Sequence, residues 1–125
     1  MAAKAVLIPW YATGFRGDKF EAALAEIAPV ALRYGAKDYH VFRSRDDRYK
    51  FLQTATFEEK LDWERYWGGE EMTRFRTIHQ GWFQVPIVYQ WTDVVIEGSL
   101  PANGNGNGGN GPTSVQDTEP VGDTI

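Results

Sequence analysis

Four of the five tryptophans lie between Thr56 and Trp91, a stretch that passes from a helical pattern into the alternating pattern of a strand. Any ligand pocket of this chain is expected to have its walls here. Aromatic side chains build pockets, cores and dimer interfaces equally well, so the stretch predicts a fold better than it predicts an activity. With 125 residues, the chain is long enough for one compact domain.

The first part of the chain predicts a strand followed by a helix. Ala5–Ala12 is an apolar and aromatic run, and Pro9 requires a bulge or a local break within it. Asp18 is placed to cap a helix that has an apolar stripe along one face, and Gly35 is placed to end this helix. Pro29 lies inside this helix and is expected to kink it or divide it in two.

The middle of the chain predicts a hairpin and a second helix. The β-like runs Lys37–Arg45 and Arg48–Thr56 form a hairpin, and we expect its charged tip, Arg43–Arg48, to be a solvated turn. Thr56–Glu59 has the pattern of a capping box and would start the helix there. Gly68-Gly69 is expected to break the helix before a further piece from Glu70 to His79.

The last predicted element is a long strand, Trp82–Glu97, with aromatic residues on both faces. Pro86 places this strand at a sheet edge or in a bulge, because proline donates no hydrogen bond to a ladder. A long aromatic edge is an association hazard unless something covers it. The simplest cover is a second copy of the chain, so we expect a homodimer.

The C-terminal part has a different composition. Residues 103–111 are only glycine and asparagine, and a polar segment follows to Ile125. We therefore expect a domain over residues 1–98 and a disordered, flexible tail over residues 99–125. Residues 112–125 are either a peptide that docks on a protein partner or an extension without a function.

Charge and cysteine content exclude several classes of function. Residues 1–98 hold all 13 lysines and arginines and 14 of the 17 acidic residues, so this part is nearly neutral. Nucleic acid and acidic membranes need a basic excess that is absent, so neither is an expected partner. The chain has no cysteine, which excludes disulfides and thiolate metal sites and fits a cytoplasmic protein.

The predicted order of elements is strand, helix, strand, strand, helix, strand. This is the ferredoxin-like βαββαβ split-sheet plan, an α+β fold in which both helices cover one face of an antiparallel sheet. Together with this order, the segments Phe57–Trp67 and Phe83–Trp91 resemble the antibiotic-biosynthesis-monooxygenase-like branch of the dimeric α/β barrel superfamily. The resemblance covers about residues 4–98.

This resemblance implies a homodimer that forms a barrel from two sheets. The family includes cofactor-independent monooxygenases of aromatic polyketides, haem-degrading enzymes and domains without an assigned activity. In the haem-degrading members a helix histidine ligates iron, with a tryptophan upstream and an asparagine on the first strand. Trp67 and His79 match two of these positions, but Pro9-Trp10-Tyr11 supplies no asparagine. We therefore expect no haem. The sequence also has no P-loop, dinucleotide fingerprint or metalloprotease helix, so we expect no other cofactor and no metal site.

The candidate catalytic residues are His79, as a proton donor or acceptor, and Arg76, as a cation that stabilises a developing enolate. Arg74 is an alternative to Arg76 in this role. Five aromatic residues are candidates for stacking on a flat substrate: Trp63, Tyr66, Trp67, Phe83 and Tyr89. Alternatively, His79 only favours the helix dipole and the aromatic rings only fill the core and the dimer contact.

Two functions are consistent with these residues. The first is a small-molecule-binding domain that takes an aromatic ligand, as a cofactor-independent monooxygenase-like or isomerase-like enzyme that shields a carbanion from water. The second is a non-catalytic dimer whose C-terminal peptide docks on a larger protein assembly.

Overall fold

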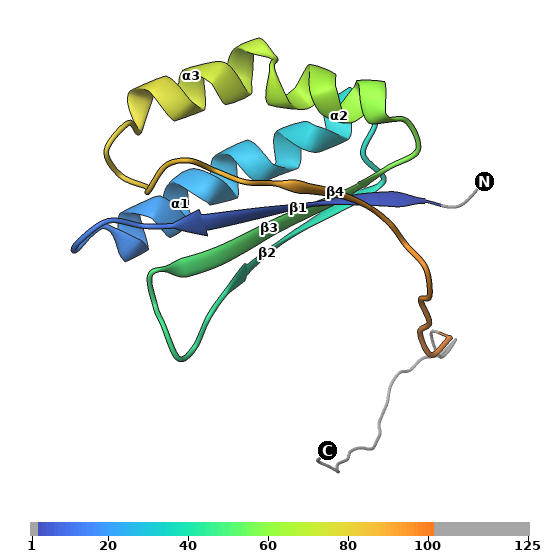
Figure 1. Ribbon diagram of the computed structural model, residues 1–125, viewed down its shortest axis with the longest axis horizontal. Coiled ribbons are helices and arrows are strands. Elements are labelled where there is room, and N and C mark those ends of the chain that lie inside the picture. The colour runs from blue at the N-terminus through green and yellow to red at the C-terminus, as the bar shows by residue number, and fades with distance from the viewer. Residues whose placement is uncertain (1–2, 102–125) are drawn as a thin grey trace. The chain divides into compact units, whose positions relative to one another are not determined.

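The computed structural model describes residues 3–101 (Figure 1). The chain divides into two units, Met1–Val95 and Ile96–Ile125. The described helices and strands all lie in the first unit: β1 (Lys4–Tyr11), α1 (Gly17–Ile27), the 3-10 helix η1 (Ala28–Tyr34), β2 (Asp38–Arg43), β3 (Lys50–Phe57), α2 (Lys60–Trp67), α3 (Glu70–Ile78) and β4 (Gln90–Asp93). Residues 96–101 form no helix or strand, and the predicted tail lies almost entirely outside the described residues.

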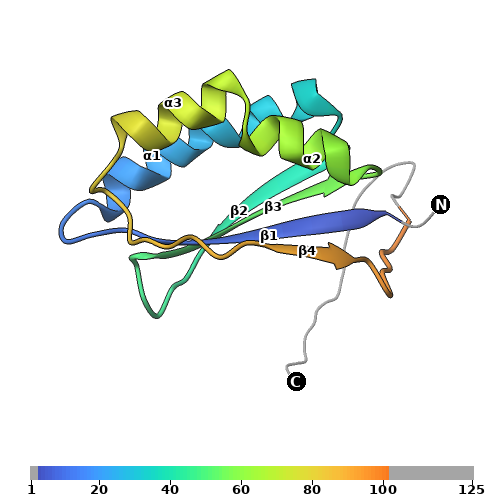
Figure 2. The same cartoon turned by 45° about the horizontal axis from the view of Figure 1, so that its top comes forward.

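The four strands form one antiparallel sheet in the order β2-β3-β1-β4. The helices all lie on one face of this sheet (Figure 2). This arrangement confirms the predicted α+β, ferredoxin-like fold. Side chains alternate between the two faces, so Val6, Ile8 and Trp10 of β1 are buried under the helices.

Pro9 fits inside β1 because it costs the sheet no hydrogen bond. The N–H of Ala12 donates to the carbonyl of Tyr49 on the β3 side, and that of Thr13 donates to the carbonyl of Trp82 on the other side. Successive N–H groups of a strand alternate, so the nitrogen of Pro9 also lies on the side away from β3. There β4 pairs with β1 only from Lys4 to Leu7, and no partner of Pro9 is lost.

The predicted long strand Trp82–Glu97 is wrong, because only Gln90–Asp93 is a strand. Phe83 forms an isolated bridge with Ala12, and regular pairing resumes at Gln90 opposite Leu7. The stretch from Phe83 to Gln90 is two residues longer than the stretch of β1 that it faces, so it leaves the ladder. Pro9 and Pro86 lie in these two stretches and border the same hollow, and neither has a backbone donor for the ladder, which agrees with the bulge here. The edge position of β4 agrees with the sequence.

The first predicted helix is divided in two, as Pro29 indicated. The α-helix ends at Ile27, η1 follows with Pro29 in its first turn, and Gly35 closes it with a φ of 104°. The predicted cap is wrong, since Arg16 holds the N-cap position and makes no side-chain cap bond. Asp18 instead lies in the first turn of α1 and binds a cation from the hairpin.

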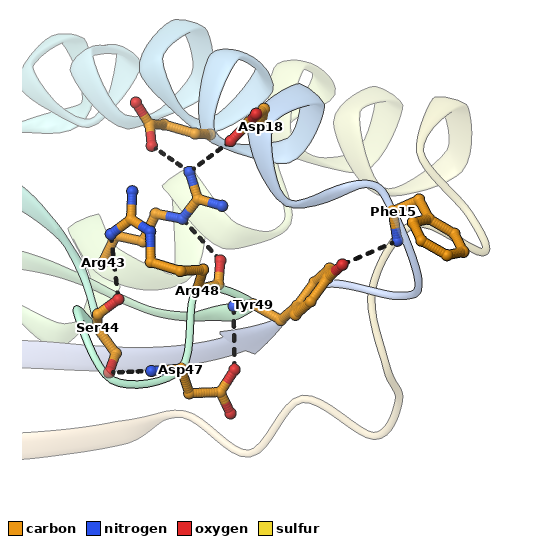
Figure 3. A network of polar contacts seen from close by, with 8 residues as sticks. Phe15, Asp18, Arg43, Ser44, Asp47, Arg48 and Tyr49 are labelled. Carbon is orange, nitrogen blue, oxygen red and sulfur yellow. Dashed lines mark hydrogen bonds and ion pairs between the residues drawn. The ribbon is translucent and has the colours of Figure 1, made fainter.

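That cation is Arg43, which holds the β2–β3 hairpin against α1 (Figure 3). Its guanidinium lies 2.9 Å from the carboxylate of Asp18, 2.8 Å from that of Glu21, and donates to the carbonyl of Arg48 at 2.7 Å. The side chain of Arg43 is only 12% exposed. The predicted solvated turn is therefore wrong at Arg43, which is a packed and fully paired residue.

The capping box is also wrong. Thr56 and Phe57 belong to β3, and α2 starts after Glu59 without a side-chain cap. Thr56 pairs with both Ala5 and Asp38, so strand pairing holds it in β3 and it cannot cap a helix. The break at Gly68-Gly69 is confirmed, since it separates α2 from α3.

A chain of polar contacts runs through the core between the sheet and the helices. Gln53 of β3 is fully buried, and its carbonyl oxygen accepts a hydrogen bond from the Trp10 indole at 3.0 Å. Its amide donates to the Tyr66 hydroxyl at 3.0 Å, and this hydroxyl donates to the carbonyl of Ile27 at 2.8 Å. The chain thus links β1, β3, α2 and α1. Burial raises the pKa of Tyr66 far above its ordinary value, so the hydroxyl stays protonated as a donor.

Removing the Tyr66 hydroxyl should destabilise the domain. In Tyr66→Phe the buried Gln53 amide and Ile27 carbonyl lose a partner, which costs about 1–3 kcal/mol of unfolding free energy. The matched control is Tyr34→Phe. The Tyr34 hydroxyl donates to the partly exposed carboxylate of Glu71, and water can replace this hydrogen bond. Urea unfolding checks this. An equal loss of unfolding free energy for both variants would show that the buried hydrogen bonds of Tyr66 contribute no more than a partly exposed one.

Candidate functional site

The sequence-predicted aromatic residues divide into buried and partly exposed rings. Trp63, Tyr66 and Phe83 are at most 6% exposed and belong to the core. Trp67 and Tyr89 are partly exposed. The Trp67 ring connects the two groups, because it lies 5.3 Å from the ring of buried Trp63. It also lies 5.6 Å from the ring of Tyr89. Phe83 lies in another part of the core, against Trp10 and Phe20.

Trp63 is the buried member of the cluster that it forms with Trp67 and Tyr89. Its ring meets Tyr89 edge to face at 4.8 Å, and its indole N–H is the one fully buried side-chain donor of residues 3–101 without a hydrogen-bond acceptor. The surroundings are therefore apolar, and an indole N–H buried there costs stability. Trp63 fills the core and forms no wall of a solvent-accessible pocket.

Trp67 and Arg76 form the polar contact that organises the site. The Arg76 guanidinium carbon lies 4.2 Å above the centre of the Trp67 ring, and Nη1 donates to the Trp67 carbonyl at 2.9 Å. That carbonyl is free to accept because α2 ends at Trp67 and the following glycines break the helix. Stacking and hydrogen bonding together hold the guanidinium in one place.

Arg76 lies in the wall of a pocket of about 430 Å³ between α3 and the segment that leads to β4. We call it the α3 pocket. Its lining residues are Thr73, Arg76, Thr77, Gln80, Gly81, Phe83, Val85 and Ile87. The volume lies within the range of small-molecule sites, about 300–1,000 Å³.

The two walls of the α3 pocket differ in polarity. One is a face of α3 with Thr73, Arg76 and Thr77 at helical spacing, and Gln80 continues it just beyond the end of the helix. The other is the apolar segment with Phe83, Val85 and Ile87. A flat ligand with one polar edge would match both walls.

The charge of Arg76 is not balanced within the described part of the chain. No carboxylate of residues 3–101 forms an ion pair with it. Burial lowers the pKa of the guanidinium from its ordinary value, yet an arginine remains charged at neutral pH. Arg74, the alternative cation, lies outside the pocket, where it is exposed and paired with Glu70.

His79 does not lie in the wall of the α3 pocket. Its ring packs against Phe75 and Trp82 at 4.6 and 4.7 Å, and Nδ1 contacts the Phe75 carbonyl at 2.8 Å. It borders a separate hollow between α1 and α3, together with Glu26 and Ile78. Of the two candidate catalytic residues, only Arg76 is in the α3 pocket, and a role for His79 stays a prediction.

Sequence reasoning missed three residues of the polar wall, Thr73, Thr77 and Gln80. Their spacing of three and four residues around Arg76 is typical of one face of a helix, and this signal was present in the sequence. The aromatic pattern predicted ligand-binding residues instead, although three of those five rings are buried in the core. Among the described residues no group of three or more histidine or acidic side chains is arranged to hold a metal.

Comparison with solved structures shows what the chain is similar to. A candidate antibiotic biosynthesis monooxygenase from Nitrosomonas europaea superposes with a TM-score of 0.69 at 13% identity, covering 75% of this chain and 91% of that one. A second from Bordetella bronchiseptica gives 0.67 at 15% identity, covering 77% and 100%. This chain has the antibiotic-biosynthesis-monooxygenase fold.

A variant of SnoaB, a cofactor-independent oxygenase from Streptomyces nogalater, shares the monooxygenase fold with a TM-score of 0.61 at 15% identity, covering 81% of this chain and 99% of that one. No family model matches the sequence, and no curated protein matches it either. The likeness confirms the resemblance at the level of the fold. No helix of the described residues is long and apolar enough to cross a membrane.

The two glycines between α2 and α3 should respond differently to alanine. A Cβ on Gly69 would lie 2.6 Å from the Arg65 carbonyl and 2.7 Å from the Tyr34 hydroxyl, whereas one on Gly68 would meet only the Glu64 carbonyl at 3.3 Å. We expect Gly69→Ala to cost about 1–3 kcal/mol, because crowding forces the helices apart. Gly68→Ala is the matched control and should cost clearly less.

Urea unfolding measures both variants. Equal stability of the two variants would show that the close approach at Gly69 does not hold the break.

Proposed function

We propose that this domain is a small-molecule-binding protein of the monooxygenase type that holds a flat aromatic ligand in the α3 pocket. The observation that carries the proposal is the α3 pocket itself, with a fixed cation on one wall and apolar side chains on the other. The solved structures of the same fold support it, since one of them is a cofactor-independent oxygenase.

In this proposal the residues of the pocket bind and orient the ligand. Phe83, Val85 and Ile87 cover its apolar face and keep water from it. Arg76 supplies positive charge where an enolate or phenolate develops, which is the electrostatic part of catalysis on such ligands. Its contacts with Trp67 fix it before the ligand arrives, so little reorganisation is needed.

We also propose that two copies of the domain associate through the sheet face that the helices leave open. This face has two hollows, one beside Pro9, Phe42 and Leu52 and the other beside Pro9, Val85 and Val88. Phe42 is 54% and Val88 65% exposed. Clustered apolar side chains of this kind mark an association surface, and a second copy offers a self-complementary cover.

The ligand proposal is tested with N-phenyl-1-naphthylamine, a neutral aromatic probe whose fluorescence rises in apolar sites. We expect saturable binding to the wild type. In Thr77→Trp a large ring at an exposed position fills the pocket and should weaken binding at least about tenfold. Glu64→Trp, an exposed position of α2 outside the pocket, is the control. Unchanged binding to Thr77→Trp would contradict the proposal.

The dimer proposal is tested by sedimentation at micromolar concentration. We expect the wild type to be a dimer and Phe42→Asp to be a monomer, because a charge in the interface has to be desolvated without a partner. Leu61→Asp is the control, since Leu61 has nearly the same exposure, 53%, but lies on α2. A monomeric wild type would refute this part of the proposal and leave the ligand test unaffected.

A further inference from the structure

The strongest unexplained feature of the domain is the unpaired charge of Arg76. Arg43 and Arg76 are the partly buried arginines of the described residues, and the others are exposed. Arg43 lies between two carboxylates, those of Asp18 and Glu21. Arg76 has none, although it too is withdrawn from water. A partly buried charge is costly without a counterion, so this site lacks an anion that the described chain does not supply.

The geometry of Arg76 leaves donors for such an anion. One of its amino groups donates to the Trp67 carbonyl, and a guanidinium has five N–H donors in a planar fork. The Trp67 ring covers one side of the fork and prevents it from swinging away. A fork held in this way suits an oxyanion, which it can bind with two parallel hydrogen bonds.

The other polar groups of the wall contain no base. The Thr77 hydroxyl donates to the Thr73 carbonyl, and the Thr73 hydroxyl lies 3.5 Å from the Gly68 carbonyl. None of the lining residues is an aspartate, glutamate, histidine or lysine. A ligand with an acidic proton would therefore lose it to water, and Arg76 would favour the ionised form.

The number of charges also limits the ligand. Arg76 is the one cationic side chain in the lining of the α3 pocket. A phosphate group carries nearly two charges and normally needs more than one cation or several backbone N–H groups. A single carboxylate, phenolate or enolate matches one guanidinium, and the apolar wall opposite matches a ring system.

We propose that the natural ligand of the α3 pocket is an aromatic monoanion, a flat ring system with one ionised oxygen acid group that pairs with Arg76. This inference rests on the proposed function, and it adds the charge of the ligand to that proposal. The single charge lies at the edge of the ring system that faces α3, and the opposite side of the ring meets Phe83, Val85 and Ile87.

The test uses two competitors of nearly the same shape, the anion 1-naphthoate and the neutral 1-naphthamide. Each displaces bound N-phenyl-1-naphthylamine from the wild type, and we expect naphthoate to compete about tenfold better, as charge-assisted hydrogen bonds imply. Added salt should weaken naphthoate alone, because the pocket is open to solvent. Equal competition at low salt would overturn the inference but leave the proposed function intact. If the neutral probe itself does not bind in the pocket, the proposed function fails instead.

Variants assign the preference to Arg76. Arg76→Gln should compete equally with both molecules, and Arg65→Gln, an exposed arginine of α2 outside the pocket, should keep the wild-type preference. If Arg76→Gln does not fold, Arg76→Lys replaces it, and we expect this variant to keep the charge preference in reduced form. A preference that survives in Arg76→Gln, or that disappears in Arg65→Gln, would overturn the assignment.

Discussion

The arrangement of the domain depends on the buried amide of Gln53. It joins the Trp10 indole on β1 to the Tyr66 hydroxyl on α2, which in turn donates to the end of α1. A buried amide tolerates few geometries, because each of its polar atoms has to keep its partner. Helices α1 and α2 are thus held in one register over the sheet, in a core that is otherwise almost entirely apolar.

The register of α2 in turn places the site. Tyr66 is fixed by Gln53, and its neighbour Trp67 is the last residue of the helix. The break at Gly68-Gly69 leaves the Trp67 carbonyl without a helical hydrogen-bond donor. It also changes the direction of α3, so that Arg76 lies over the Trp67 ring. Arg76 is therefore positioned in the pocket wall by the backbone at the end of α2, which Gln53 fixes through Tyr66.

Sequence patterns predicted the elements better than their ends or their contacts. The order of elements, the division at Pro29 and the break at Gly68-Gly69 follow from local backbone chemistry, which a sequence displays directly. The capping box at Thr56 and the long last strand failed because strand pairing across the chain decides both, and pairing partners are not visible locally.

The site was harder to predict, because burial decides whether an aromatic ring binds a ligand or fills a core. Trp63 and Tyr66 carry the same sequence signal as Trp67, yet they lie inside. The bulged segment after Phe83 shows a further reason. Where it leaves the ladder, Ile87 lines the α3 pocket beside Phe83, Val88 lines a hollow of the open face, and Val85 lines both. One irregular segment thus lines both the α3 pocket and a hollow of the open face, so the proposed ligand binding and the proposed association would share a few side chains.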